Sequence, residues 1–287
     1  MKLTFTKRTR RLARMLMLAF LVAAIGSTAA YAQDYKEAYN NGLEAAKAKN
    51  YDEAYAQFSK AVEGARQAGD AEVEKRASKV LAQLDYRNGL KATKAENYEE
   101  ALTHFDKGIA HYPTNAKNYL GKALALKKLD RMDDAMALFQ QAKEVGEANG
   151  DRKTARTAEK AIRDQYIYLA SSTLSKKGDR TGRAEGEQAL AYLEEMQKYV
   201  EPDADAYYYM AEAYKAMGNY QQAVAMADKA LELHRGSRTD KAKIYFVKGE
   251  SLMALQDYEG AKAAFQNAAY GSYKATAQHY IETLGTR

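Results

Sequence analysis

The chain of 287 residues has no cysteine and no tryptophan, and it has only two prolines, Pro113 and Pro202. Without cysteine the fold has no disulfide, and neither a thiolate zinc site nor a cysteine-linked lipid can form. The scarcity of proline allows long uninterrupted helices. We therefore expect a helical protein that is held together by packing alone.

Acidic residues are absent from residues 1–32, which hold six basic ones. An apolar run from Met15 to Ile25 follows the last of these, and Ala30-Tyr31-Ala32 forms an A-x-A cleavage pattern. The run is too short for a comfortable transmembrane helix. These features predict a signal peptide over 1–32, cleaved near Ala32/Gln33, and an exported, soluble product, periplasmic or secreted. An uncleaved anchor is the alternative. The pair of arginines in "TRRLAR" leaves open whether export follows the general or the twin-arginine route.

The net charge of +6 belongs to this N-terminal segment. The rest of the chain has 38 basic and 38 acidic residues. Its neutrality removes the electrostatic reason to expect a nucleic acid partner.

The strongest pattern is an internal repeat. "AKNYDEAYAQFSKAV", Ala48 to Val62, returns 47 residues later as "AENYEEALTHFDKGI", Ala95 to Ile109. Tyr51, Ala54 and Phe58 keep their offsets in the second copy as Tyr98, Ala101 and Phe105.

These segments resemble tetratricopeptide repeats (TPRs), helix–turn–helix units of 34 residues. That family has a small residue at positions 8, 20 and 27 and aromatic residues at positions 4, 17 and 24. Numbered from Ala82, the second repeat has Gly89 at position 8 and Phe105 at position 24. The fifth repeat departs from the pattern, with Ala227 at position 24.

The resemblance implies the following organisation: TPR 1 at 35–68, TPR 2 at 82–115 with its first helix extended from about 71, TPR 3 at 116–149, a degenerate TPR 4 at 163–203 with an insertion at about 176–186, TPR 5 at 204–237, TPR 6 at 242–275 and a C-terminal cap at 276–287. Small residues let helices approach closely, aromatics fill the space between them, and each copy covers its neighbour. We expect an all-α, right-handed TPR superhelix of about six repeats with a capping helix. An antiparallel coiled coil would need heptads that this period lacks, and a plain helical bundle remains the alternative.

Motifs for chemistry are sparse. His104 and His111 lie seven residues apart, and the chain has neither an HExxH nor a GxSxG motif. The carboxylate doublets, such as Glu99-Glu100, point about 100° apart on a helix and do not converge. We predict that the chain is not an enzyme and binds no metal or cofactor.

In TPR proteins the first helix of each repeat lines a concave face that binds peptides. Carried over by position, the resemblance assigns a partner groove to Tyr39, Tyr86, Lys94, Lys117, Tyr208 and Phe246. The alternative is that these aromatics are half-buried packing residues. The positions that grip a C-terminal carboxylate in chaperone-adaptor TPRs match only at Lys117, so we expect no such clamp.

"KKGDRTGRAEG", Lys176 to Gly186, is basic and rich in glycine. We read it as an insertion between the two helices of TPR 4. Its cations could also contact an anionic partner, through Lys176, Lys177, Arg180 and Arg183.

The sequence therefore favours an exported, non-enzymatic TPR scaffold that binds a protein or peptide in the cell envelope. The alternative is a structural homo-oligomer or a membrane-held assembly factor. The step from repeat family to process is an analogy, and the sequence does not name the partner.

Overall fold

The computed structural model describes residues 34–175 and 182–285. These residues are helices joined by short turns, and none of them lies in a β-strand. The predicted signal peptide at 1–32 and most of the predicted insertion lie outside the described residues. After a helix at 34–47, the elements are α2 (Tyr51–Ala68), α3 (Ala71–Lys94), α4 (Tyr98–His111), α5 (Ala116–Lys128), α6 (Met132–Ala148), α7 (Arg152–Leu174), α8 (Arg183–Met196), α9 (Ala204–Ala216), α10 (Tyr220–Leu233), α11 (Arg238–Ala254), α12 (Tyr258–Ala268), a 3₁₀ turn η1 (Gly271–Tyr273) and α13 (Lys274–Gly285).

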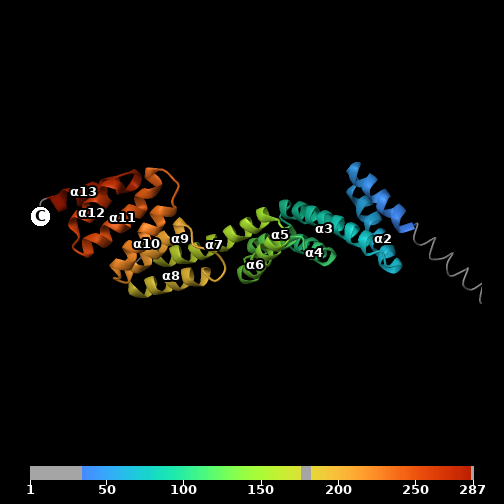
Figure 1. The fold of residues 1–287 in the computed structure, drawn as a ribbon, viewed down its shortest axis with the longest axis horizontal. Coiled ribbons are helices and arrows are strands. Elements are labelled where there is room, and N and C mark those ends of the chain that lie inside the picture. Colours follow the sequence, from blue (N-terminus) through green and yellow to red (C-terminus); the bar gives the residue numbers. More distant parts are fainter. Residues whose placement is uncertain (1–33, 176–181, 286–287) are drawn as a thin grey trace, which may run out of the picture. The chain divides into compact units, whose positions relative to one another are not determined.

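Consecutive helices pack as antiparallel pairs (Figure 1). The most extensive packing joins α3 with α4, α5 with α6, α9 with α10 and α11 with α12. The prediction of an all-α solenoid built from helix pairs is therefore confirmed. The chain divides into two compact units, residues 1–155 and 156–287.

In three repeats the core is an aromatic ring held against a glycine. Phe105 of α4 is fully buried, and a Cβ added to Gly89 of α3 would lie 2.5 Å from its ring. Gly121 of α5 touches the same ring from the next repeat. In the second unit Gly249 and Phe265 repeat this arrangement, with a Cβ at 2.7 Å. The small residue at position 8 is thus what allows the two helices of a repeat to close on the aromatic at position 24.

The turns carry the expected capping residues. Asp70 accepts a hydrogen bond from the backbone N–H of Val73 (3.1 Å) at the start of α3, and Gly69 before it has φ of 72°. Ser237 and Asp240 form a capping box at the start of α11. Caps of this kind fix where one helix ends and the next begins.

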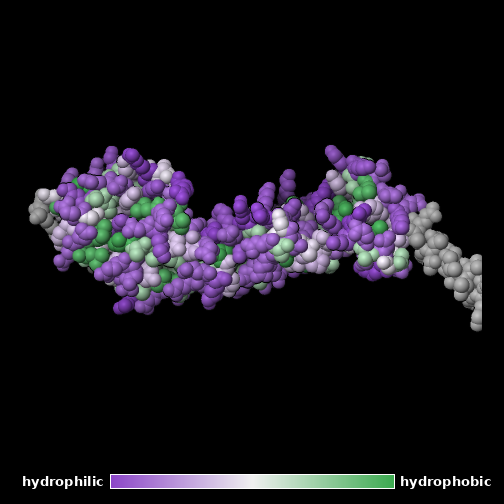
Figure 2. Space-filling view, viewed as in Figure 1, coloured by the Kyte–Doolittle hydropathy of each residue, from purple (hydrophilic) through white to green (hydrophobic). Residues whose placement is uncertain are grey.

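The last helix covers the end of the repeat array. Ala277 and Leu284 of α13 are buried against α12, and the Tyr280 ring stacks on Phe265 with centroids 4.7 Å apart. Within residues 34–175 and 182–285, no helix is long and apolar enough to cross a lipid bilayer. The face seen in Figure 2 is mostly hydrophilic along α3–α6 and shows larger hydrophobic groups over the helices from α10 to α13.

Candidate functional site

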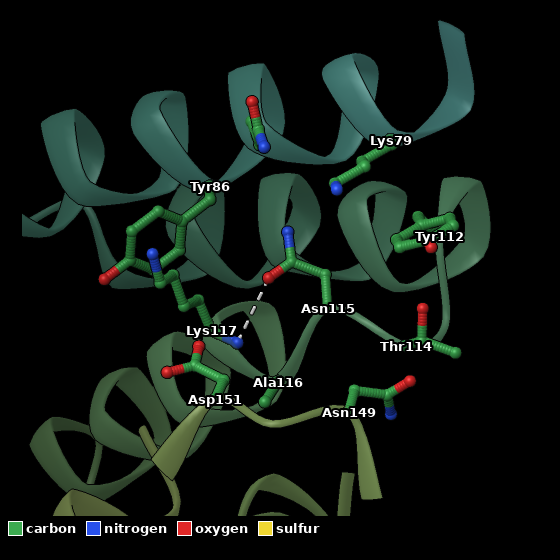
Figure 3. A pocket seen from close by; sticks show the side chains of 10 residues that line it. Lys79, Tyr86, Tyr112, Thr114, Asn115, Ala116, Lys117, Asn149 and Asp151 are labelled. Atoms are coloured by element: carbon green, nitrogen blue, oxygen red, sulfur yellow. Dashed lines mark hydrogen bonds between the residues drawn. The ribbon is translucent and has the colours of Figure 1, made fainter. Parts of the chain in front are cut away.

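The first unit contains a hollow of about 420 Å³ between α3, the turn after α4, and the start of α5. The turn between α6 and α7 closes its other side. Figure 3 shows Lys79 and Tyr86 pointing from α3 toward Asn115 and Lys117. We call this hollow and the α3 and α5 faces beside it the α3–α5 groove. Its lining residues are Lys79, Gln83, Tyr86, Tyr112, Thr114, Asn115, Ala116, Lys117, Asn149 and Asp151.

Two helix starts shape the hollow. Asn115 is the N-cap of α5, and its side chain accepts a hydrogen bond from the Lys117 backbone N–H at 3.2 Å. Asp151 directly precedes α7 and accepts hydrogen bonds from the Thr154 backbone N–H (3.2 Å) and hydroxyl (2.8 Å). The carboxylate of Asp151 is thus engaged as a cap, and the turn that carries it is fixed.

Tyr86 forms the apolar wall of the hollow. Its ring lies 6.0 Å from that of Phe105, centroid to centroid, which fixes its orientation. Burial, and to a lesser degree the charge of Asp151, raises the pKa of the Tyr86 hydroxyl above its usual range. The hydroxyl is therefore protonated at neutral pH and can donate a hydrogen bond into the groove.

An apolar strip continues beyond the hollow along both helices. Leu90 follows Tyr86 by one helical turn and is 45% exposed, and Leu124 of α5 is 42% exposed. Each leucine is followed one turn later by a lysine, Lys94 on α3 and Lys128 on α5. The groove thus offers exposed apolar surface with cations at both ends.

The cations of the groove lack ion-pair partners in the part of the chain that the structure describes. None of those residues forms an ion pair with Lys79, Lys94, Lys117 or Lys128. All four side chains are exposed. Their charges are therefore available to an anionic ligand.

The groove brings together three of the six residues that the sequence assigned to a partner. Tyr86 and Lys117 line the hollow, and Lys94 lies two turns from Tyr86 on the same face of α3. Tyr39 lies in the first repeat, where its ring packs edge-on against Phe58 with centroids 5.6 Å apart. It does not line the hollow.

Tyr208 and Phe246 belong to the second unit and are packing residues there. Tyr208 is only 9% exposed, and the Lys243 ammonium lies 4.6 Å from the centroid of its ring. Phe246 packs against the rings of Phe265, Tyr273 and Tyr280. For these two positions the structure favours the packing alternative.

The basic insertion falls mostly outside the described residues. This applies to Lys176, Lys177 and Arg180. Arg183 is the first residue of α8, where its guanidinium pairs with the Glu187 carboxylate at 3.0 Å. That cation is engaged within its own helix, in an exposed pair of small energetic value.

Two of the four histidines, His104 and His111, lie on α4 in the first unit. His111 donates a hydrogen bond from Nδ1 to the fully buried Asp85 at 2.7 Å. His104 is half-buried, with Nε2 3.8 Å from the Glu100 carboxylate. Within the described ranges, no group of three His, Cys, Asp or Glu side chains could hold a metal ion.

Three notable residues escaped the analysis of the sequence. Leu90 and Leu124 both occupy position 9 of their repeats. This is also a groove position, but the prediction of the groove relied on the aromatic residues at position 5. Asp85 occupies position 4 of its repeat, where other repeats have Tyr119, Tyr207 or Tyr245. An acidic residue in place of an inward-facing aromatic is a signal in the sequence that could have marked it.

Comparison with known families agrees with the repeat pattern. Two family models, both described as tetratricopeptide repeat, match this chain. One covers residues 92–157, and the other covers residues 204–235 and 242–270. No curated protein matches the chain. Repeats of this family are generally non-catalytic and typically bind protein or peptide partners.

Solved structures of TPR proteins are similar to the chain at low identity. A thermophilic TPR protein of Thermus thermophilus is 20% identical, with a TM-score of 0.36, over 72% of this chain and 100% of that one. A TPR repeats protein of Bacteroides fragilis is 19% identical, with a TM-score of 0.39, over 88% and 98%. YrrB, described as a TPR protein with an unusual peptide-binding site, is 17% identical, with a TM-score of 0.37, over 79% and 96%.

The matched segments lie in both compact units and cover α4–α6 in the first and α9–α12 in the second. Residues 92–157, 204–235 and 242–270 of this chain are therefore tetratricopeptide repeats.

Proposed function

We propose that this protein is a non-catalytic scaffold that binds a segment of another protein in the α3–α5 groove. One observation carries the proposal: exposed leucines on α3 and α5 lie beside lysines that have no partner in the described residues. Exposed apolar side chains flanked by unsatisfied charge are typical of surfaces that bind partners.

The groove selects the chemistry of its partner. Leu90, Leu124 and the ring of Tyr86 can bury apolar side chains. The lysines at both ends favour carboxylates. The best ligand is therefore a peptide segment in which aspartate or glutamate flanks leucine or an aromatic residue.

We further propose that the protein acts outside the cytoplasm, in the cell envelope or after secretion. This part rests on the residues of 1–32 alone, where a basic segment, a short apolar run and an A-x-A pattern follow one another. N-terminal sequencing of the protein recovered from cells tests it. A mature chain that begins at Gln33 supports export, and an intact Met1 in a soluble cytosolic fraction contradicts it.

Crosslinking mass spectrometry on native extracts tests the groove. The protein is used as wild type, as a Lys79→Glu, Lys117→Glu variant, and as a Lys60→Glu, Lys75→Glu variant. The last pair is the matched control, because both lysines are exposed in the same unit and the net charge changes equally. Circular dichroism confirms that all three are folded.

We expect a partner that wild type and control capture equally and the groove variant loses by about tenfold or more. Raising the salt from about 50 to about 300 mM should weaken capture several-fold, because exposed charges are screened. A partner captured equally by all three variants contradicts the groove. Crosslinks of the protein only to itself would favour the homo-oligomer instead.

A further inference from the structure

A second hollow lies in the first unit, apart from the groove. It has a volume of about 280 Å³ and lies where α2, α3 and α4 meet. It adjoins another of about 310 Å³, with which it shares Asp52, Asn88 and His104. Its lining residues are Asp52, Tyr55, Asp85, Asn88, His104 and Lys107. We call it the Asp85 hollow.

Asp85 is the unusual member of this set. Its side chain is fully buried, and Oδ2 accepts the hydrogen bond from His111 at 2.7 Å. The other oxygen, Oδ1, is buried and has no hydrogen-bond partner among the described residues. A buried carboxylate oxygen without a donor is costly, so its environment calls for one.

His104 supplies a second unsatisfied acceptor. The Glu100 carboxylate near Nε2 favours the tautomer that carries its proton there. Nδ1 is then an acceptor, and it too is buried without a partner in the described residues. The wall of the hollow therefore contains two separate buried acceptors, one on α3 and one on α4.

The charges around the hollow favour a cation. Asp85 and Asp52 line it, and Lys107 is the only ammonium in the lining set. Burial, then the charge of Asp85 and a hydrogen bond to its side chain, raise the pKa of Tyr55 to about 12, so the Tyr55 hydroxyl adds no negative charge at neutral pH. The Tyr55 ring provides an aromatic wall on which a planar cation can stack.

We propose that the Asp85 hollow binds a guanidinium group. This group is planar and carries five N–H donors in a fixed fork, so it can donate to more than one acceptor at once, and Asp85 Oδ1 and His104 Nδ1 are the acceptors of this lining that lack a donor among the described residues. An ammonium is a point donor and matches two separate acceptors less well. The volume exceeds that of a single water, about 30 Å³, by enough to admit an organic cation.

The four histidines make the proposal measurable by NMR. Histidine ring signals of the full chain are followed while methylguanidinium is added, with sodium chloride as the ionic-strength control. His104 and His111 border the site, and His234 and His279 belong to the other unit and serve as internal references. We expect saturable shifts of the first pair only, with a dissociation constant of about 1–10 mM, reasonable for so small a ligand.

Two variants locate the binding. Asp85→Asn keeps the shape but removes the charge, and we expect at least a tenfold loss of affinity. Asn88→Leu narrows the hollow without touching the pair of Asp85 and His111, and we expect the same loss with the His111 signal in place. Lys79→Glu with Lys117→Glu should leave this binding unchanged, which separates it from the groove. Shifts that do not saturate, or equal affinity in Asp85→Asn, would mean that the hollow holds only water and would overturn the proposal.

The guanidinium can belong to an arginine side chain of a partner protein or to a small free compound. A short peptide with one arginine distinguishes these two sources. Binding at least tenfold tighter than methylguanidinium would identify an arginine side chain of a partner protein as the natural ligand. Equal affinity would identify a free guanidino compound. A peptide with lysine in place of arginine should bind more weakly than either, and tighter binding of lysine would contradict the fork geometry.

Discussion

The first helices of the repeats carry cations in both units, and the two units use these cations differently. In the first unit Lys79 and Lys117 line the α3–α5 groove without ion pairs among the described residues. In the second unit Lys215 of α9 lies between Glu212 and Glu250, at 2.9 and 2.8 Å. Lys243 of α11 pairs with Asp205 at 2.7 Å and covers the Tyr208 ring.

This difference distinguishes charges that hold neighbouring repeats together from charges that are available to a ligand. The pairs of the second unit join α9 to α11, so they brace neighbouring repeats. Although burial alone would lower it, the pKa of Lys215 is raised by Glu212 and Glu250, which keeps the braced cation charged. A helix face whose charges are paired with one another has few charges available to a ligand. On α3 and α5 the lysines of the groove have no ion pair among the described residues, so their charges are available to a partner.

The largest expected effect on stability tests the packing of a phenylalanine ring against a glycine, which the two units share. Phe105→Ala in the first unit and Phe265→Ala in the second each remove a fully buried ring held against a glycine. Each should lower the free energy of unfolding by about 3–5 kcal/mol, the usual cost of emptying such a site. Urea unfolding followed by circular dichroism measures it. If only one of the two variants lost stability, the units would not share one packing scheme.

This packing could be predicted from the sequence because it is periodic. Gly89 and Phe105 stand at fixed offsets in their repeat, and helical geometry then places one against the other. The helix starts at Asp70 and Ser237 follow from capping chemistry within a few residues. Local and periodic patterns were therefore sufficient for the fold.

The site was less predictable because its contacts are not periodic. Tyr208 and Phe246 hold groove positions, yet Lys243 covers one and the Tyr273 ring covers the other. Tyr273 lies in the 3₁₀ turn after the last repeat, where no repeat position predicts its placement. Likewise, the sequence shows which face carries Lys117 and Lys215, but their pairing depends on neighbours in the next repeat.

A smaller effect on stability should distinguish Lys215, which pairs with two glutamates, from Lys117, which has no ion pair among the described residues. Lys215→Met leaves Glu212 and Glu250 facing each other, and should cost about 1–3 kcal/mol. Removing one partner of a fully buried pair costs more, but this side chain is 26% exposed. Lys117→Met, the matched change in the groove, should alter stability by less than about 0.5 kcal/mol. Urea midpoints of the two variants provide the measurement.

The opposite ranking of these two variants would show that the groove lysine is structural. In that case the exposure of the Lys117 side chain would not indicate that it binds a ligand. A double variant, Lys215→Met with Glu250→Gln, sharpens the result. It removes one of the stranded carboxylates and should recover part of the lost stability, because the cost lies in uncompensated charge.

The smallest effect concerns the carboxylates at two helix starts. The backbone N–H of Val73, and next the Tyr35 hydroxyl at 2.9 Å, hold the pKa of Asp70 below its usual value of about 3.9. The side-chain and backbone hydrogen bonds of Ser237 do the same for the pKa of Asp240. A depressed pKa contributes stability above about pH 4 that is lost as the pH falls through the folded-state value.

Asp70→Asn and Asp240→Asn should therefore each lower the melting temperature at pH 6, and the gap from wild type should shrink as the pH falls through the lowered pKa of each carboxyl group. The gap should be wider for Asp70, because its carboxylate also anchors Tyr35 of the first helix, whereas Asp240 caps only its own helix. Thermal melts from pH 6 to pH 2.5, with exposed Asp130→Asn as the control, test both points. A gap that stays constant with pH would show that the lost hydrogen bond matters and the charge does not. Equal gaps for the two variants would show that Asp70 acts as a cap alone, without holding the first helix of the array in place.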